Sequence, residues 1–175
     1  MVRVRSFFRH GDAPYYVQFD VSMDGETKAS SFVVEVATLD QLPNSVFSFL
    51  TLVDHDVYMG AEFLSTQSII HLDSDEDTVA TLGYAASALS LVESSSEGRC
   101  APYSVGFVGA NGGLKLIMTN DASKHGSLAC FGRIAQGRQT VSNIQRAGRE
   151  GKTVAITGVT TVQLESTPNM REGEL

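Results

Sequence analysis

Apolar and polar residues alternate along several short segments of the chain, which is the period of a strand with one buried face. The first segment is Tyr15–Met23, and the Asp24-Gly25 pair after it suits a hairpin turn into a second alternating segment at residues 32–36. Gly158 interrupts a late segment and is a candidate for a β-bulge. The remaining strand-like segments are residues 58–72, 103–108, 114–118, 128–134 and 154–164.

Helical spacing replaces this alternation in two clear places. Pro43 stands in the first turn of one segment, where its missing N–H is harmless, and apolar residues then recur at helical spacing, which predicts a helix near Pro43–Asp54. Val141 and Ile144 indicate a second helix at residues 140–147, and residues 82–91 are a candidate for a further short one. Many strands with only two clear helices favour a closed all-β barrel over alternating β/α units.

The length of 175 residues fits one domain with a core of its own. We expect an N-terminal extension at residues 1–14, the domain at 15–165 and a polar tail at 166–175. No run of about 18 apolar residues is present to span a membrane. The net charge of -7 argues against a nucleic-acid partner, because phosphate binding requires a concentrated basic surface. Composition leaves the cellular compartment open.

Three short stretches carry motifs in a telling order. Residues 42–49 read L-P-N-S-V-F-S-F, residues 58–63 read Y-M-G-A-E-F, and residues 130–134 read C-F-G-R-I with Gly137 and Val141 after them. They resemble V-P-K-T-x-x-N-F, Y-x-G-x-x-F and V-F-G-K-V-x-x-G-x-x-V of the cyclophilin family. The resemblance implies a mainly β fold, a closed antiparallel barrel of about eight strands with two capping helices. It also implies prolyl-isomerase chemistry that uses no cofactor and no metal.

The catalytic position that the resemblance implies is altered. In cyclophilins an arginine guanidinium donates to the prolyl nitrogen and weakens the delocalisation behind a rotation barrier of about 20 kcal/mol. After Phe63, the resemblance puts Leu64 at the family's histidine and Ser65 at its arginine. A serine hydroxyl is short and neutral and cannot supply a fixed cationic donor. We therefore expect weak or absent isomerase activity, unless a distant residue such as Arg99 takes over the role.

The peptide groove that the resemblance implies is altered as well. Ile70 stands at a pocket phenylalanine, His71 at the methionine and Asp73 at the glutamine. Residues 111–117, N-G-G-L-K-L-I, resemble the family's N-G-S-Q-F-F-I but lose a polar residue and two aromatic ones, and the chain has no Trp. Leu128 stands where the family often has histidine. The candidate groove residues are Phe63, Ile70, His71, Asp73, Val108, Leu114, Leu116 and Leu128.

Other residues with metal-binding or redox chemistry form no recognisable motif. The four histidines lack the close His/Cys pairs of a zinc site. The acidic run at residues 73–77 begins like a calcium loop but has Thr78 at the turn glycine and Tyr84 at the closing glutamate. Cys100 and Cys130 are far apart in sequence, and we predict two free thiols, although a single bridge stays open.

A retained scaffold beside a replaced site predicts a protein-binding or structural module, with a protein or a proline-containing peptide as partner. Two alternatives remain. The first is a divergent but active isomerase that binds the twisted prolyl bond in an apolar pocket without the arginine. The second is an accessory subunit of a larger assembly, in which the two terminal segments would serve as arms. The sequence does not separate the binding module from the accessory subunit.

Overall fold

A computed structural model of the chain describes the segments that carry most of the predicted strands and both main helices. The candidate helix at 82–91, the acidic residues 74–77, Arg99, Cys100 and Leu128 lie outside them. The described residues are 14–24, 29–38, 42–65, 69–73, 101–110, 113–119 and 130–163.

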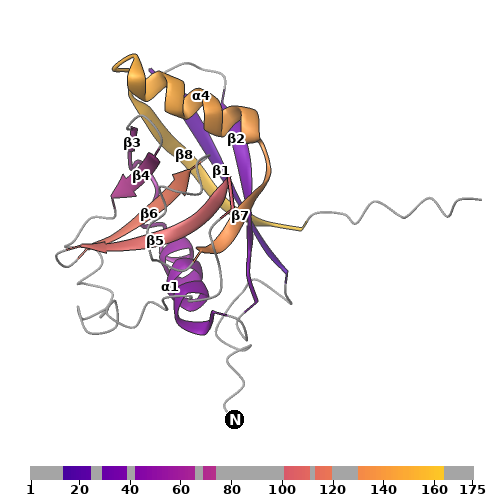
Figure 1. The fold of residues 1–175 in the computed structure, drawn as a ribbon. Helices are drawn as coiled ribbons and strands as arrows, with labels where there is room; N and C mark the ends of the chain where they lie inside the picture. The colour runs from indigo at the N-terminus through magenta and orange to yellow at the C-terminus, as the bar shows by residue number, and fades with distance from the viewer. Residues whose placement is uncertain are drawn as a thin grey trace, which may run out of the picture.

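Eight strands and two helices make up the described structure (Figure 1). Neither helix has the length and apolarity to span a bilayer. The helices are α1 (Pro43–Asp54) and α4 (Arg138–Arg149). The strands are β1 (Tyr15–Met23), β2 (Ser30–Val36), β3 (Phe63–Ser65), β4 (Ile69–Asp73), β5 (Ser104–Ala110), β6 (Gly113–Thr119), β7 (Cys130–Gln136) and β8 (Val154–Val162).

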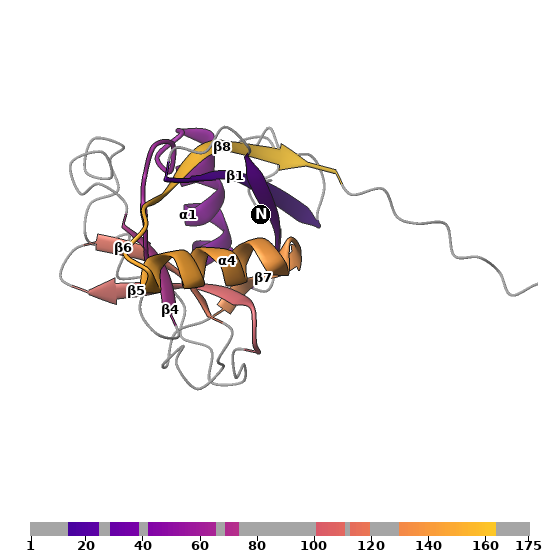
Figure 2. The same ribbon diagram turned by 90° about the horizontal axis from the view of Figure 1, so that it is seen from above.

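All eight strands belong to one antiparallel sheet in the order β3-β4-β6-β5-β7-β2-β1-β8. The sheet curls, with α4 over one end and α1 at the other (Figures 1 and 2). Its two edges meet at a bridge between Glu62 and Ala155, beside a hydrogen bond of 2.9 Å from the Ile156 amide to the Ala61 carbonyl. The fold is therefore mainly β, as predicted, while closure along the full length of the edges stays a prediction.

The alternation in β1 has the predicted physical cause. Val17, Phe19 and Val21 are fully buried, whereas the residues between them are half-buried. The core they enter is rich in aromatic rings, and Phe49 of α1 lies with its ring centroid 5.0 Å from that of Phe131 in β7. Such a ring pair contributes about 0.5–1.5 kcal/mol beyond the apolar area that it buries. The apolar face of α1 thus anchors the helix inside the curled sheet.

The bulge predicted at Gly158 is present. Asp20 of β1 pairs with Gly158 of β8 while the next residue, Val21, pairs with Ile156, so that Thr157 is the extra residue. A Cβ on Gly158 would lie 2.8 Å from the Asp20 carboxylate, so a side chain at this position would require the carboxylate to move. The bulge lets β8 bend beside β1 without breaking the ladder.

The second helix is longer than predicted. It begins at Arg138 and ends at Arg149, two residues beyond the predicted 140–147 at each end. Three of the four added residues, Arg138, Gln139 and Arg149, are polar and exposed, so the apolar periodicity could not indicate them. Gly137 precedes the helix with a left-handed φ of 78°, and its Cα lies so close to β2 that a Cβ would be 2.5 Å from the Ser31 carbonyl oxygen. Glycine therefore permits the turn from β7 into α4.

The prediction of two free thiols is wrong, because Cys130 is disulfide-bonded. The chain contains one other cysteine, Cys100. The physical reason is the long-range pairing of strands, which brings segments far apart in the sequence together: Gly106 of β5 lies opposite Cys130 of β7. Separation along the sequence could not indicate this proximity.

Candidate peptide groove

β3, which contains the predicted catalytic positions Leu64 and Ser65, is short and pairs with β4. Ser65 lies opposite Ile70 and Leu64 lies opposite His71, so the two predicted catalytic positions pair with two predicted groove positions in the register. The turn at residues 55–60, which overlaps the Y-M-G-A-E-F stretch, connects α1 to β3 and is hydrogen-bonded to β8. Gly60 has a φ of 77° at the end of that turn, and its amide donates a 3.0 Å hydrogen bond to the Ile156 carbonyl of β8.

The next strands bring most other groove positions into the same part of the sheet. β6 lies beside β4, with Asp73 opposite Lys115. β5 lies on the other side of β6, where Val108 pairs with Lys115 and Gly109 with Leu114. Leu116 pairs with both Leu72 and Phe107, the residues that flank it on β4 and β5. The structure thus collects every predicted groove position except Leu128, which lies outside the described residues.

Phe63 has a role in the core. Its side chain is only 5% exposed, and its ring centroid is 6.2 Å from that of Phe32 on β2. On the other strands of the group, Phe107 of β5 and Met118 of β6 are fully buried. Phe63 therefore supports the inner face of the sheet at the start of β3, and its contact with a peptide stays a prediction.

Two of the described arginines have partners of their own. The Arg133 guanidinium on β7 donates from Nε and Nη2 to Oε2 of Glu35 on β2, at 3.0 and 2.8 Å. Arg138 at the start of α4 lies over the ring of Tyr103, with its Cζ 5.1 Å from the ring centroid. Arg99, the alternative donor, lies outside the described residues and stays untested.

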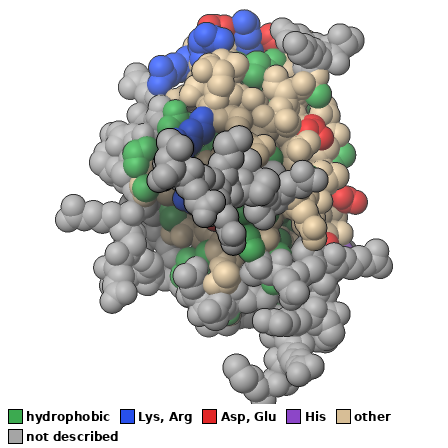
Figure 3. Space-filling model, turned by 90° about the vertical axis from the view of Figure 1, so that its right-hand side faces the viewer, with side chains coloured by type: hydrophobic (Ala, Val, Ile, Leu, Met, Phe, Trp, Pro, Cys, Tyr) green, Lys and Arg blue, Asp and Glu red, His purple; other side chains and the backbone are tan. Residues whose placement is uncertain are grey.

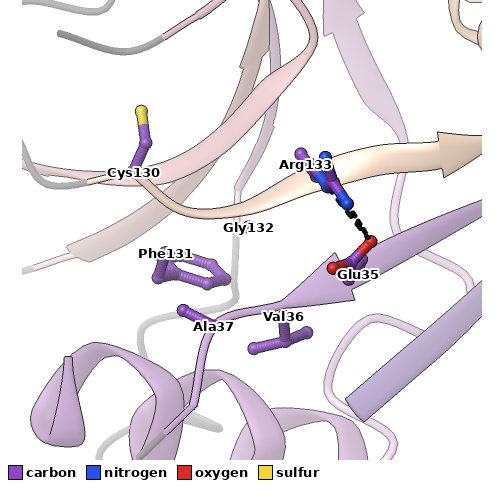
Figure 4. Close-up of a pocket in the computed structure, with 7 residues that line it drawn as sticks. All are labelled: Glu35, Val36, Ala37, Cys130, Phe131, Gly132 and Arg133. Atoms are coloured by element: carbon purple, nitrogen blue, oxygen red, sulfur yellow. Dashed lines mark hydrogen bonds and ion pairs between the residues drawn. The ribbon is translucent and has the colours of Figure 1, made fainter. Parts of the chain in front are cut away.

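A separate cavity of about 250 Å³ opens between β2 and β7 (Figure 4). The Glu35–Arg133 ion pair crosses it, and Arg133 is 68% exposed, so the pair contributes little stability. In the sheet order, β6 and β5 stand between β4 and β7, the strand that lines this cavity. Its lining residues are Glu35, Val36, Ala37, Cys130, Phe131, Gly132 and Arg133.

Sequence reasoning missed the arrangement around Tyr103. This residue has a left-handed φ of 64°, its ring lies under Arg138, and its hydroxyl is 3.5 Å from Oγ of Ser142 on α4. The contact joins segments 35 or more residues apart, and no local motif indicates it. The basic residues of α4 were visible in the sequence, and their helical spacing could have indicated a charged face. Within the described residues, no group of His, Cys, Asp and Glu is arranged to hold a metal ion.

Comparison with known proteins extends these observations. No protein-family model and no curated protein sequence matches the chain. The crystal structure of a cyclophilin type peptidyl-prolyl cis-trans isomerase from Cryptosporidium parvum is similar with a TM-score of 0.58 at 12% identity, over 86% of this chain and 99% of that chain. A structure of that isomerase in the presence of the dipeptide Ala-Pro has a TM-score of 0.54 at 12% identity, over 85% and 99%. A likeness at this level of identity shows the fold.

Proposed function

We propose that this chain, whose fold is cyclophilin-like, binds protein segments at the β3–β4–β6 groove and catalyses prolyl isomerisation weakly or not at all. The proposal depends on Ser65, which lies at the end of β3 and which the sequence resemblance assigns to the position of the family's catalytic arginine. Removing one donor aimed at a transition state costs about 100-fold to 1,000-fold in rate. The strands proposed to hold a peptide are present in the sheet, and the sequence resemblance puts no cationic side chain at the donor position.

Two observations support a peptide as the bound partner. β3, β4 and β6 are neighbours in the sheet, so Ile70, Leu114 and Leu116 supply apolar residue types in one region. The similar isomerase from Cryptosporidium parvum was crystallised in the presence of Ala-Pro. An apolar groove of this kind would accept a proline ring or another apolar side chain, and His71 and Asp73 would offer polar atoms to the peptide backbone.

A coupled proline-isomerisation assay on a short Xaa-Pro peptide tests the catalytic part. We expect the wild-type chain to turn over at least about 100-fold more slowly than an active cyclophilin. Ser65→Arg and Leu64→His/Ser65→Arg should recover little, because the residues that replace the family's pocket remain. Ser65→Ala is the matched control and should leave the wild-type rate unchanged. Wild-type turnover comparable to that of the active enzyme would overturn the proposal.

Peptide binding is measured separately by calorimetric titration with an Xaa-Pro peptide and with its Xaa-Ala counterpart. Binding of either peptide, weakened by a charged substitution at Leu116, supports the groove. Failure of both peptides to bind would reject it.

The alternative of a divergent active isomerase requires another donor, for which Arg99 is the candidate. If the wild-type chain is active, Arg99→Gln should abolish that activity. Retained activity in Arg99→Gln would exclude this donor.

A further inference from the structure

The outer face of α4 is basic on an acidic protein. The helix carries Arg138, Arg146 and Arg149 and no acidic residue, while the whole chain has a net charge of -7. With 3.6 residues per turn, these three arginines fall within an arc of about 80° on the exposed side of the helix. The opposite side holds the buried residues Val141 and Ile144, which attach the helix to the sheet. We call the three arginines the α4 arginine stripe.

Uncharged neighbours hold two of these arginines in place. Arg138 lies over the ring of Tyr103, which is joined to the helix by the contact between its hydroxyl and Ser142. Nη2 of Arg146 donates a 3.1 Å hydrogen bond to Oδ1 of Asn143, an oxygen that also accepts a bond from the Gln139 side chain. These partners order the guanidinium groups without neutralising them. An ordered cation loses less side-chain entropy when it binds an anion.

The nearest acidic side chain has its own partner. Glu150 follows the helix, and its carboxylate bonds to Nζ of Lys152 at 2.8 Å. The hydrogen bond and charge of Lys152, with a smaller effect of Arg146, hold the pKa of Glu150 below its usual range. Figure 3 shows Lys and Arg side chains gathered at the top of the molecule, at the height of α4, with acidic side chains beside them. Beyond the end of the stripe, Glu150 is thus paired with Lys152, while Arg138 and Arg146 are exposed to solvent.

We propose that the α4 arginine stripe binds an extended acidic segment of a partner protein. Arg138 and Arg146 are eight residues apart, which is about 12 Å along a helix. An extended peptide rises about 3.3 Å per residue, so carboxylates three or four residues apart match this spacing. A long polyanion such as duplex DNA, or an anionic membrane, would meet the negative charge of the rest of the chain, whereas a short segment needs to contact only the stripe. The occupant is therefore an acidic peptide segment.

The probe is a fluorescein-labelled, proline-free dodecapeptide with Glu at every fourth position, so that the result does not depend on the proposed groove. Fluorescence anisotropy is measured at about 20 mM and about 500 mM salt, because exposed ion pairs are screened. Each exposed carboxylate–guanidinium contact changes affinity roughly two- to fivefold. We therefore expect the double variant Arg138→Gln/Arg146→Gln to weaken binding about five- to twentyfold.

Arg133→Gln is the matched control, since it removes the same charge from an exposed arginine outside α4 and should change the affinity less than about twofold. Arg138→Lys/Arg146→Lys should retain most of the affinity, which separates a loss of charge from a loss of folding. Absence of peptide binding at low salt, an equal loss in Arg133→Gln, or equal binding of a peptide with Gln in place of Glu would overturn the proposal. Tighter binding of duplex DNA, of phosphatidylserine vesicles or of a second copy of the chain would overturn it in favour of that partner.

Discussion

At the scale of single residues, Tyr58 stands out because its hydroxyl is buried in an aromatic environment. The ring is fully buried, with its centroid 6.0 Å from that of Phe19 and 6.1 Å from that of Phe49. None of the residues that the structure describes bonds to the hydroxyl. Burial raises the pKa of this tyrosine above the ordinary 10.0, because the phenolate would lose its hydration. A buried hydroxyl without a partner costs about 1–3 kcal/mol.

Tyr58→Phe should therefore be more stable than the wild type by about 1 kcal/mol at neutral pH. The gap should widen in alkali. A folded-state pKa above the unfolded value leaves stability intact below about pH 10, and the wild type then loses about 1.4 kcal/mol per pH unit as the pH rises toward the folded-state pKa. Urea unfolding of both proteins at neutral pH and near pH 11 measures this difference. A variant clearly less stable than the wild type at neutral pH would mean that the hydroxyl has a partner.

The structural role of a single residue could be predicted from the sequence where that role depends on residues close to it in the chain. Pro43 at a helix start and Gly158 at a bulge follow from local backbone rules, and both predictions are confirmed. Tyr103 shows the opposite case, since its contact with Arg138 joins the turn before β5 to the start of α4, which is 35 residues later in the sequence. The groove roles predicted near Ser65 also combine residues from strands far apart in the sequence, so only the family resemblance could suggest them.

At the scale of elements, the connection from β7 into α4 depends on one glycine. Gly137 combines a left-handed φ with close approach to β2, where a Cβ would lie 2.6 Å from the Cα of Phe32 as well as against the Ser31 carbonyl. Gly151, after the helix, has a similar φ of 72° but nothing within 4 Å of the position of a Cβ. The two positions therefore separate backbone strain from steric contact.

Gly137→Ala should lose more than about 3 kcal/mol of unfolding free energy, because strain and overlap add. Gly151→Ala should lose only about 1 kcal/mol, the cost of the left-handed backbone alone. Chemical denaturation of the two variants side by side gives the comparison. Equal losses would show that β2 moves aside at no cost and that contact at Gly137 is unimportant.

Element prediction succeeded where apolar residues mark a face. The start and end of α1 and the alternation of β1 and β2 were readable, because each buries a regular set of side chains. The ends of α4 were not, because polar residues such as Arg138 and Arg149 complete the helix without entering the core. The bulge that leaves Phe131 unpaired against β5 was not predicted either, since it follows from how Val105 and Gly106 pair with β7.

At the scale of the whole molecule, the disulfide at Cys130 ties distant parts of the chain together. With Cys100 as its partner, the bridge would close a loop of about 30 residues and contribute about 3–4 kcal/mol by restricting the unfolded chain. It would also favour an oxidising environment for the protein.

Thiol counting on the denatured, unreduced protein should therefore find no free thiol, and two after reduction. Cys130→Ser should unfold at a lower denaturant concentration by an amount close to that of reducing the wild type. Two thiols before reduction would contradict the bridge. A Cys130→Ser variant as stable as the oxidised wild type would contradict its contribution to stability.

The overall class of the fold was predictable, because many alternating segments with few helices leave few architectures. The order of strands was not, since neighbours such as β7 and β2 lie about 100 residues apart and nothing local records their pairing. The cyclophilin motifs bridged that gap by resemblance, and the solved structures confirm the fold.

The short contact between the two edges of the sheet determines where the curled sheet can open. β8 follows β1 along nearly its whole length, whereas within the described residues it meets the β3 edge only around Glu62 and Ala155. Separating the two edges there breaks the Glu62–Ala155 bridge but none of the ladders that join neighbouring strands in the sheet order. Local opening should therefore need the least free energy at this contact. α4 packs against both β3 and β8 and so holds the two edges of the sheet together. A partner bound along α4 would stabilise the helix against both edges and slow amide hydrogen exchange in β3 and β8.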